Sequence, residues 1–205
     1  MPKSIPFIEE TAVRYPGTPV LKSCVLSDDF VIQGVLFKKD SVIGFDEKGR
    51  LWRCNISQDT VIGGLPCKAK SEVEFSPEGR VLACTLSAGT TIQGTNASAG
   101  SLAIFHENGR LFKCDAGLDA VIEGYPVKAG KDVCFFEDGR LSAFDLSEDY
   151  DIEGIPCRAA TRVWLKTDGR LKACTLGRNL TIRGTSCKGG QLIVFNEDGG
   201  LVFSG

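Results

Sequence analysis

Hydrophobic and polar positions alternate along this chain in short runs, and one run recurs every 30 residues. Alternation of this kind is typical of β-strands, and no segment keeps the i, i+3, i+4, i+7 spacing of an amphipathic helix. The recurring run holds an apolar residue, usually aromatic, then a polar turn ending in glycine and an apolar step into the next segment. Its six copies are FDEKGRL at 45–51, FSPEGRV at 75–81, FHENGRL at 105–111, FFEDGRL at 135–141, LKTDGRL at 165–171 and FNEDGGL at 195–201.

This period organises the whole chain. Repeats that each carry little apolar surface must bury it against their neighbours, so the repeats are expected to stabilise one another. We predict a single repeat domain over residues 1–205. It comprises a partial repeat at 1–20, repeats at 21–50, 51–80, 81–110, 111–140, 141–170 and 171–200, and a partial strand at 201–205.

Each repeat is predicted to hold three short strands. Two of them, at V-x-F and at L-x-x-C, are joined by a tight hairpin, because Asn or Asp followed by Gly supplies the left-handed conformation of such turns. A third, weaker strand is expected at I-x-G, before a turn such as YPVKAG at 125–130. The predicted fold is an all-β tandem array of antiparallel hairpins, an elongated sheet or solenoid. A closed, six-fold propeller-like ring is the alternative.

Three apolar columns are predicted to point inward as stacked ladders. They are the first residue of L-x-x-C, the last residue of V-x-F, and the isoleucine of I-x-G. In the second repeat these positions are Leu51, Phe75 and Ile62.

The segments FHENGRL, FFEDGRL and FNEDGGL resemble the core of bacterial MORN-variant repeats, which carry an aromatic residue, an Asn-Gly or Asp-Gly turn and a basic-aliphatic step. The resemblance covers about seven residues of each repeat, and the I-x-G half is not part of that pattern. It implies sheets built from successive hairpins and a role as an interaction or scaffold module. Some members of that family bind lipid head groups or act as antitoxins. The resemblance does not assign a functional residue in this chain.

Charge and hydropathy exclude several classes of partner. The formal net charge of the 205 residues is -2, which lacks the basic footprint of a nucleic-acid-binding protein. No run approaches the ~18 apolar residues of a membrane span. The opening MPKSIPFIEE has no apolar core of a signal peptide, so we predict a cytoplasmic protein. An exported protein whose leader has been removed is the alternative.

The chain has nine cysteines, which could form disulfides or bind a metal ion. Most fall in two columns that also hold Phe, Val or Ala, which indicates buried thiols packing as small hydrophobic side chains. Disulfides within a repeat need both columns filled, which happens only in the repeats 51–80 and 171–200. No C-x-x-C and no histidine pair is present, so we predict no metal and no cofactor. Unpaired thiols favour a reducing compartment.

The sequence offers no catalytic constellation. His106, the single histidine, occupies a column that otherwise holds Asp46, Ser76, Phe136, Lys166 and Asn196, which is typical of a solvent-facing position beside a turn. No nucleotide-binding, hydrolase or metalloprotease motif is present. We therefore predict that the protein is not an enzyme and has no catalytic residue.

An arginine closes five of the six repeats. Because guanidinium groups bind carboxylate and phosphate, this column could form a stripe for an anionic partner or for anionic lipid head groups. The alternative is a ladder of exposed ion pairs, each contributing about 0–1 kcal/mol. The acids would be Asp29, Asp59, Asp119 and Asp149, or the turn acids Glu47, Glu107, Glu137 and Glu197. The column consists of Arg50, Arg80, Arg110, Arg140 and Arg170.

These observations favour a non-enzymatic binding or scaffold module that presents one extended β-surface to a protein partner. A structural component of an envelope or filament, assembling through open edge strands, is the alternative.

Overall fold

The computed structural model describes residues 5–204, so residues 1–4 of the predicted partial repeat and Gly205 of the predicted partial strand lie outside the described residues. The described chain is all-β, with 26 strands and one 3-10 turn at Glu9–Thr11. Its internal contacts divide it into two compact bodies. The N-terminal body runs up to Thr90 and includes Ala99–Gly109; the C-terminal body comprises Thr91–Ser98 and the chain from Arg110 on.

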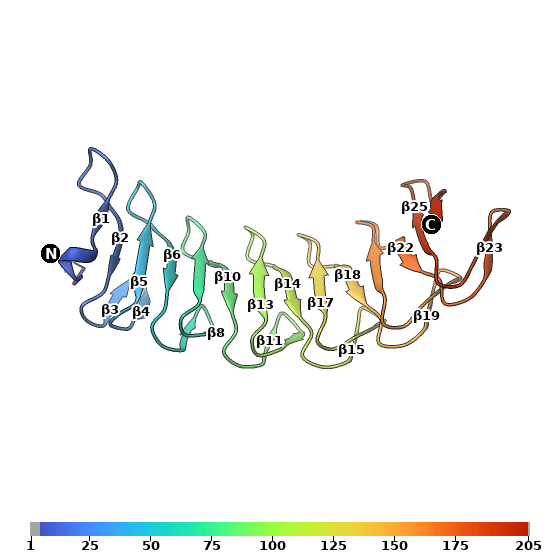
Figure 1. Cartoon of the computed structure of the whole chain (residues 1–205), viewed down its shortest axis with the longest axis horizontal. Coiled ribbons are helices and arrows are strands. Elements are labelled where there is room, and N and C mark those ends of the chain that lie inside the picture. The colour runs from blue at the N-terminus through green and yellow to red at the C-terminus, as the bar shows by residue number, and fades with distance from the viewer. Residues whose placement is uncertain (1–4, 205) are drawn as a thin grey trace. The chain divides into compact units, whose positions relative to one another are not determined.

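Long strands form the main sheet of each body, in chain order and with antiparallel neighbours (Figure 1). In the N-terminal body they are β1 (Val13–Arg14), β2 (Leu21–Val25), β5 (Val42–Phe45), β6 (Leu51–Asn55), β9 (Glu72–Phe75), β10 (Val81–Thr85) and β13 (Leu102–Phe105). In the C-terminal body they are β14 (Leu111–Asp115), β17 (Asp132–Phe135), β18 (Leu141–Asp145), β21 (Arg162–Leu165), β22 (Leu171–Thr175), β25 (Leu192–Phe195) and β26 (Leu201–Ser204).

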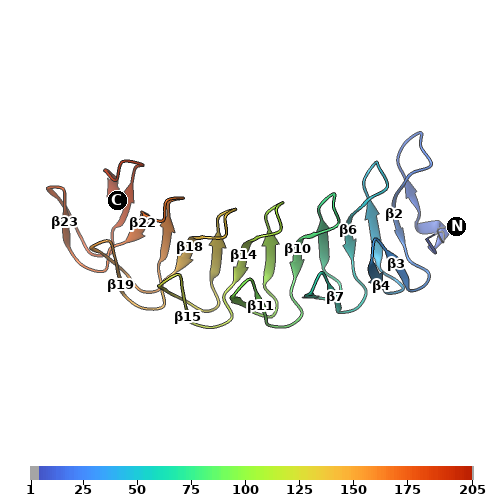
Figure 2. The same cartoon turned by 180° about the vertical axis from the view of Figure 1, so that it is seen from behind.

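Short strands form a second set of hairpins, which lie on one face of the sheet in each body and are seen from the front in Figure 2. The two-stranded pairs are β3 (Phe30–Ile32) with β4 (Val35–Phe37), β7 (Thr60–Ile62) with β8 (Leu65–Cys67), β11 (Thr90–Ile92) with β12 (Thr95–Ala97), β15 (Ala120–Ile122) with β16 (Tyr125–Val127), β19 (Tyr150–Ile152) with β20 (Ile155–Cys157), and β23 (Leu180–Ile182) with β24 (Thr185–Cys187).

A repeat therefore holds four strands, and the prediction of three was wrong. The last two residues of I-x-G form a turn of the I′ kind, in which Gln33 and Gly34 have φ of 49° and 83°. The segment after this turn, expected to be irregular, is the returning strand. Its proline is tolerated because Pro66 faces Val61 one pair beyond the turn-closing pair Ile62–Leu65, where no ladder bond needs its missing N–H.

The L-x-x-C spacing departs from the two-residue period of a strand because the tight hairpins within each body contain a β-bulge. Between Trp164 and Leu165, for example, the register shifts by one residue against Leu171 and Ala173. The bulge turns the first and fourth residues of the following strand to the same face. Leu171 and Cys174 are accordingly both buried.

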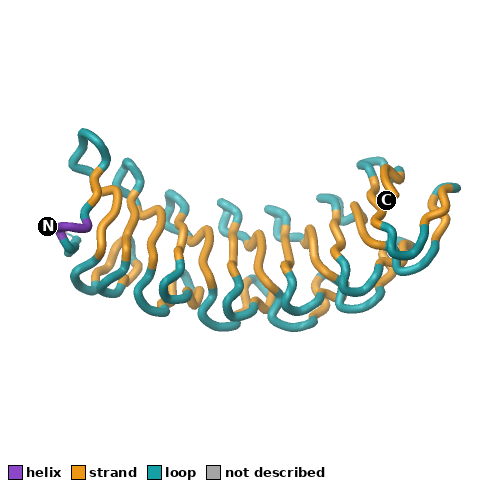
Figure 3. The backbone as a smooth tube through the Cα atoms, viewed as in Figure 1, coloured by secondary structure: helices purple, strands orange, loops and turns teal. Residues whose placement is uncertain are grey.

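The predicted inner ladders are largely confirmed, and they line the face that the short hairpins cover. Five of the six isoleucines of I-x-G are buried, and Ile122 is half-buried. Leu51, Phe45 and Phe75 are at most 5% exposed. The tube in Figure 3 shows the strands of each repeat linked by short loops.

The sheet is open, so the ring-shaped alternative is wrong. Among residues 5–204, β1 has only β2 as a neighbour in the main sheet, and β26 has only β25. A ring would require these outermost strands to pair. In the described part of the chain, no helix has the length and apolar character that crossing a membrane requires.

Candidate binding hollow and the arginine column

The arginine column lies on the tight turns of the main sheet. Four of its members form ion pairs with an acid of their own turn: Arg50 with Asp46, Arg80 with Glu78, Arg140 with Asp138 and Arg170 with Asp168, at 2.6 to 3.3 Å. These partners differ from the acids considered in the sequence. The Asp138 carboxylate also accepts the backbone N–H of Arg140 at 2.9 Å.

Four of the arginines also reach the next turn along the chain. Arg80 donates to the backbone oxygen of Glu107 at 3.0 Å, and Arg170 donates to that of Glu197 at 3.1 Å. Arg110 and Arg140 make the same kind of bond to Asp138 and Thr167. The column therefore ties consecutive turns together within each body. The anion-binding stripe stays a prediction, and an anion bound there would compete with these carbonyl and carboxylate partners.

Arg50 differs from the other four because, among residues 5–204, its side chain bonds only within its own turn. Its Nε donates to Asp46 Oδ2 at 2.8 Å, and Asp46 Oδ1 accepts the backbone N–H groups of Lys48 and Arg50 at 2.9 and 2.8 Å. Burial would raise the pKa of Asp46, but these hydrogen bonds and the Arg50 charge hold it below its ordinary value. Asp46 is therefore a carboxylate at neutral pH.

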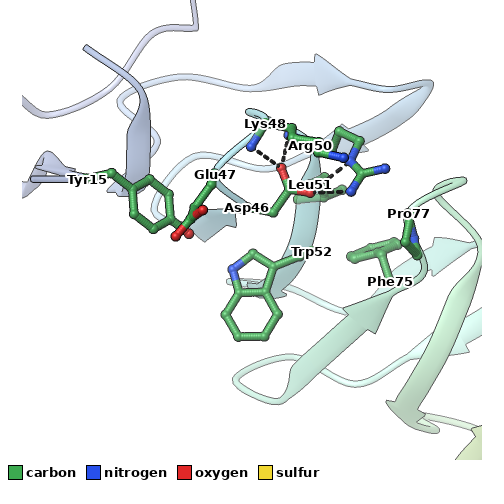
Figure 4. Close-up of a pocket in the computed structure, with 9 residues that line it drawn as sticks. All are labelled: Tyr15, Asp46, Glu47, Lys48, Arg50, Leu51, Trp52, Phe75 and Pro77. Atoms are coloured by element: carbon green, nitrogen blue, oxygen red, sulfur yellow. Dashed lines mark hydrogen bonds and ion pairs between the residues drawn. The ribbon is translucent and has the colours of Figure 1, made fainter. Parts of the chain in front are cut away.

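A hollow of about 510 Å³ lies beside Arg50, where its side chain does not bridge to the next turn (Figure 4). Aromatic side chains from three strand regions line it: Tyr15, Trp52 and Phe75, with Pro77 of the next turn. The Tyr15 hydroxyl donates to the backbone oxygen of Phe45 at 2.8 Å, which fixes that ring at the wall. The hollow is thus apolar at its base, with charged groups of the turn at its rim.

Trp52 is the most exposed aromatic side chain at this site, at 40%. The Arg53 guanidinium stacks 4.5 Å from the centre of its ring, and Arg53 also pairs with Glu72 at 3.5 Å. Gly44 on the neighbouring strand makes this arrangement possible. A Cβ atom at Gly44 would lie 2.9 Å from Arg53 Cγ and 3.2 Å from Trp52 Nε1.

Trp52 is not part of any catalytic or charged motif, so it was not among the predicted site residues. The signal was available, because the corresponding position of the other repeats does not hold tryptophan. Its counterparts are Lys22, Leu82, Phe112, Ser142 and Lys172. A lone tryptophan opposite a lone glycine could have been singled out once the strand register was known.

The corresponding place in the C-terminal body is smaller and partly filled. The hollow beside Leu171 and Phe195 measures about 290 Å³. Lys166 stands where Asp46 stands in the repeat 21–50; it is 4% exposed and donates to the backbone oxygens of Asn196 and Glu197. The buried Lys166 side chain spans two turns and occupies part of this hollow. Asp46 instead binds Arg50 within its own turn, which leaves more room beside it.

Other candidate chemistry is not assembled by the fold. His106 is half-buried, and its backbone oxygen accepts the Gly109 N–H at 2.8 Å as part of the tight turn. Within residues 5–204, no group of three or more histidine, cysteine or acidic side chains is placed to hold a metal ion. All nine cysteines are free thiols, and only Cys134 among them is not buried.

No protein-family model matches the chain, and no curated protein matches it either. The resemblance to MORN-variant repeats therefore stays a prediction based on the turn residues. The function has to be inferred from the geometry of the site.

Proposed function

We propose that the protein is a non-enzymatic binding module for a protein partner, and that the partner docks over the Trp52 hollow of the N-terminal body. An apolar or aromatic side chain of the partner fills the hollow between Trp52 and Phe75. Polar groups of the partner meet Arg53 and the charged turn at the rim. The regular hairpins serve as the rigid support for this contact.

The observation that carries the proposal is a half-exposed tryptophan at the edge of an apolar hollow. Tryptophan, tyrosine and arginine dominate the binding energy of protein interfaces, usually around a pocket that excludes water. Trp52, Tyr15 and Arg53 combine these three residue types in one place. The Tyr15 ring is held by its hydrogen bond and the Trp52 ring by the stacked Arg53 guanidinium, so little side-chain ordering remains to oppose binding.

Affinity capture with matched variants tests the proposal. Immobilised wild-type protein, Trp52→Ala and Trp164→Ala are compared for the proteins they retain from a lysate. Trp164 is the appropriate control because it is also a strand tryptophan, 38% exposed, and belongs to the C-terminal body. We expect a partner that is retained by wild type and by Trp164→Ala and lost with Trp52→Ala. Equal retention by all three proteins would rule out docking at this hollow.

Self-assembly through edge strands is the competing function. It is supported by β26, which has a neighbour on one side only among the described residues and therefore presents unpaired backbone groups. Light scattering after size exclusion distinguishes the two. A mass that stays at one chain over a hundredfold dilution favours the binding module, and a mass that grows with concentration favours assembly.

The free cysteines support a reducing compartment such as the cytoplasm as the place of action. Denaturation of freshly broken cells in the presence of a thiol reagent, followed by mass spectrometry, would test this: nine labelled cysteines support a reducing compartment, and disulfide-linked ones contradict it.

A further inference from the structure

Consecutive repeats meet at a point where each contributes a cysteine. The short hairpin of one repeat ends beside the main strand that opens the next: Cys67 forms a β-bridge with Leu86, and the Lys68 N–H donates to the Thr85 oxygen at 2.8 Å. Cys67 and Cys84 are thus the immediate neighbours of two hydrogen-bonded residues. Both cysteines are 0% exposed, and the Cys67 thiol donates to the backbone oxygen of Leu65 at 3.5 Å.

The C-terminal body repeats this arrangement. Cys157 forms a β-bridge with Leu176, and the Arg158 N–H donates to the Thr175 oxygen at 2.8 Å. Cys157 and Cys174 are 1% and 0% exposed, and the Cys157 thiol donates to the backbone oxygen of Ile155 at 3.5 Å.

Other repeat boundaries have the same backbone contact but different side chains. Ala97 bridges to Ala116 next to Cys114, and Val127 bridges to Leu146 next to Phe144. Packing is therefore satisfied by Ala with Cys or by Val with Phe, and does not itself require two thiols. These boundaries provide the internal controls for the cysteine pairs.

We propose that Cys67 with Cys84, and Cys157 with Cys174, are two dithiol modification sites at which a small-molecule disulfide oxidant links adjacent repeats. The thiolate of one cysteine attacks a sulfur of the oxidant, forms a mixed disulfide and releases one oxidant thiolate. The second cysteine then attacks the protein sulfur of the mixed disulfide and releases the other oxidant thiolate. Each site gives up two electrons and two protons, and the oxidant is reduced to two thiols.

Burial governs how fast these thiols react. The thiolate is the nucleophile, and both cysteines of each pair are at most 1% exposed. Complete burial requires local opening before an oxidant can enter, so the reaction is slow in the native protein.

The crosslink should stabilise the fold, because it closes a loop of the unfolded chain between neighbouring repeats. Oxidation is therefore expected to raise the melting temperature, and reduction with dithiothreitol to restore the original value. Disulfides of this kind in a reducing compartment are transient and sense the redox state.

The test is oxidation of the purified full chain with oxidised glutathione, followed by mass spectrometry of the intact protein and of its peptides. We expect the loss of four hydrogens per chain and peptides linked through Cys67–Cys84 and Cys157–Cys174. The variant Cys67→Ala should lose only the first link, and Cys114→Ala, the matched cysteine that lies next to Ala97, should keep both.

Links within a repeat, such as Cys54–Cys67 or Cys174–Cys187, would overturn the proposal. It would also fail if all nine thiols still reacted with a thiol reagent in denaturant after prolonged oxidation. The wild-type peptide map decides the matter even where a variant does not fold.

Discussion

At the scale of single residues, two acids face each other on the outer side of the C-terminal sheet. Asp115 and Asp132 are register partners on β14 and β17. Burial, and then the hydrogen bond and charge of Asp132, raise the pKa of Asp115. The hydrogen bond from Lys113 lowers the pKa of Asp132, with which it forms an ion pair at 2.7 Å. Ionised Asp115 therefore opposes folding.

The substitution Asp115→Asn should stabilise the protein at pH 7 by about 0.2–1 kcal/mol, the range for removing like charges from a cross-strand pair. Because the pKa of Asp115 is raised in the folded state, the destabilisation caused by its charge is complete above that pKa. It disappears below the pKa of the unfolded state, about 3.9. Urea unfolding at pH 7 and at pH 3.5 should show the gain at pH 7 and almost none at pH 3.5.

Asp145→Asn is the matched control for this prediction. Asp145 occupies the same column one repeat later but accepts from Arg162 at 3.2 Å, in an ion pair whose side chains are 23% and 16% exposed. Its replacement should lower stability at pH 7. Stabilisation by both substitutions would contradict the account of the Asp115 pair.

At the scale of the elements, an aspartate closes the loop around the short hairpin in four of the six repeats. The Asp149 carboxylate accepts the Ala159 N–H at 2.6 Å, and Asp119 and Asp59 accept the N–H ten residues later in the same way. These aspartates therefore bind the backbone of turns and, in the described part of the chain, not the arginine column. Asn179 does the same with Gly189 at 2.8 Å, so an amide suffices.

Replacement of Asp149 by alanine should cost about 0.5–1.5 kcal/mol of unfolding free energy, the usual net worth of such a hydrogen bond. Asp149→Asn should cost less, because Asn179 shows that the amide oxygen reaches the same N–H group. Asp151→Ala, on the exposed side of the same hairpin, should change stability by less than about 0.5 kcal/mol. Thermal and urea unfolding measure all three; an equal cost for alanine at 149 and 151 would exclude the turn-closing role.

The two kinds of hairpin differ in how far the sequence determines them. The tight hairpin could be predicted because its Asp-Gly or Asn-Gly turn is explicit in the residues. The second hairpin was missed because its left-handed turn position carries residues such as Glu123, with φ of 50°, which rarely adopt that conformation. The Glu123 carboxylate accepts the Leu141 N–H of the next repeat at 3.1 Å, and this long-range bond offsets the local backbone strain.

The hollow could not be predicted for a related reason. Arg50 belongs to a column whose other members bridge to the next turn, and only the structure shows that it folds back onto Asp46. The contact of Gly44 with Trp52 depends on the bulge that shifts register between Gly44 and Phe45. Neither the side-chain conformation nor the bulge is visible in the hydrophobic pattern.

At the scale of the whole molecule, the same ion pair between a turn carboxylate and an arginine recurs in several repeats. The loss of folding stability at low pH should therefore be the sum of the losses at the individual turns. Hydrogen bonds from Arg140 lower the pKa of Asp138, and those from Arg170 lower that of Asp168. A lowered folded-state pKa contributes stability above the unfolded value of about 3.9, which is lost as the pH falls through the folded value.

The melting temperature should therefore be flat from about pH 7 to pH 5 and should fall below about pH 4. The double variant Asp138→Asn/Asp168→Asn should melt lower than wild type at pH 7 and lose less on acidification. Calorimetry over this range tests the prediction, and an unchanged melting temperature down to pH 2 would refute it.

The central claim is that Trp52 contacts the protein partner, and its fluorescence tests this most directly. The chain has two tryptophans, so Trp164→Phe leaves Trp52 as the reporter and Trp52→Phe leaves Trp164. Titration of the captured partner should produce a saturable change in the emission of Trp52 and none in that of Trp164. A change in Trp164 emission with an unaltered Trp52 signal would contradict the claim.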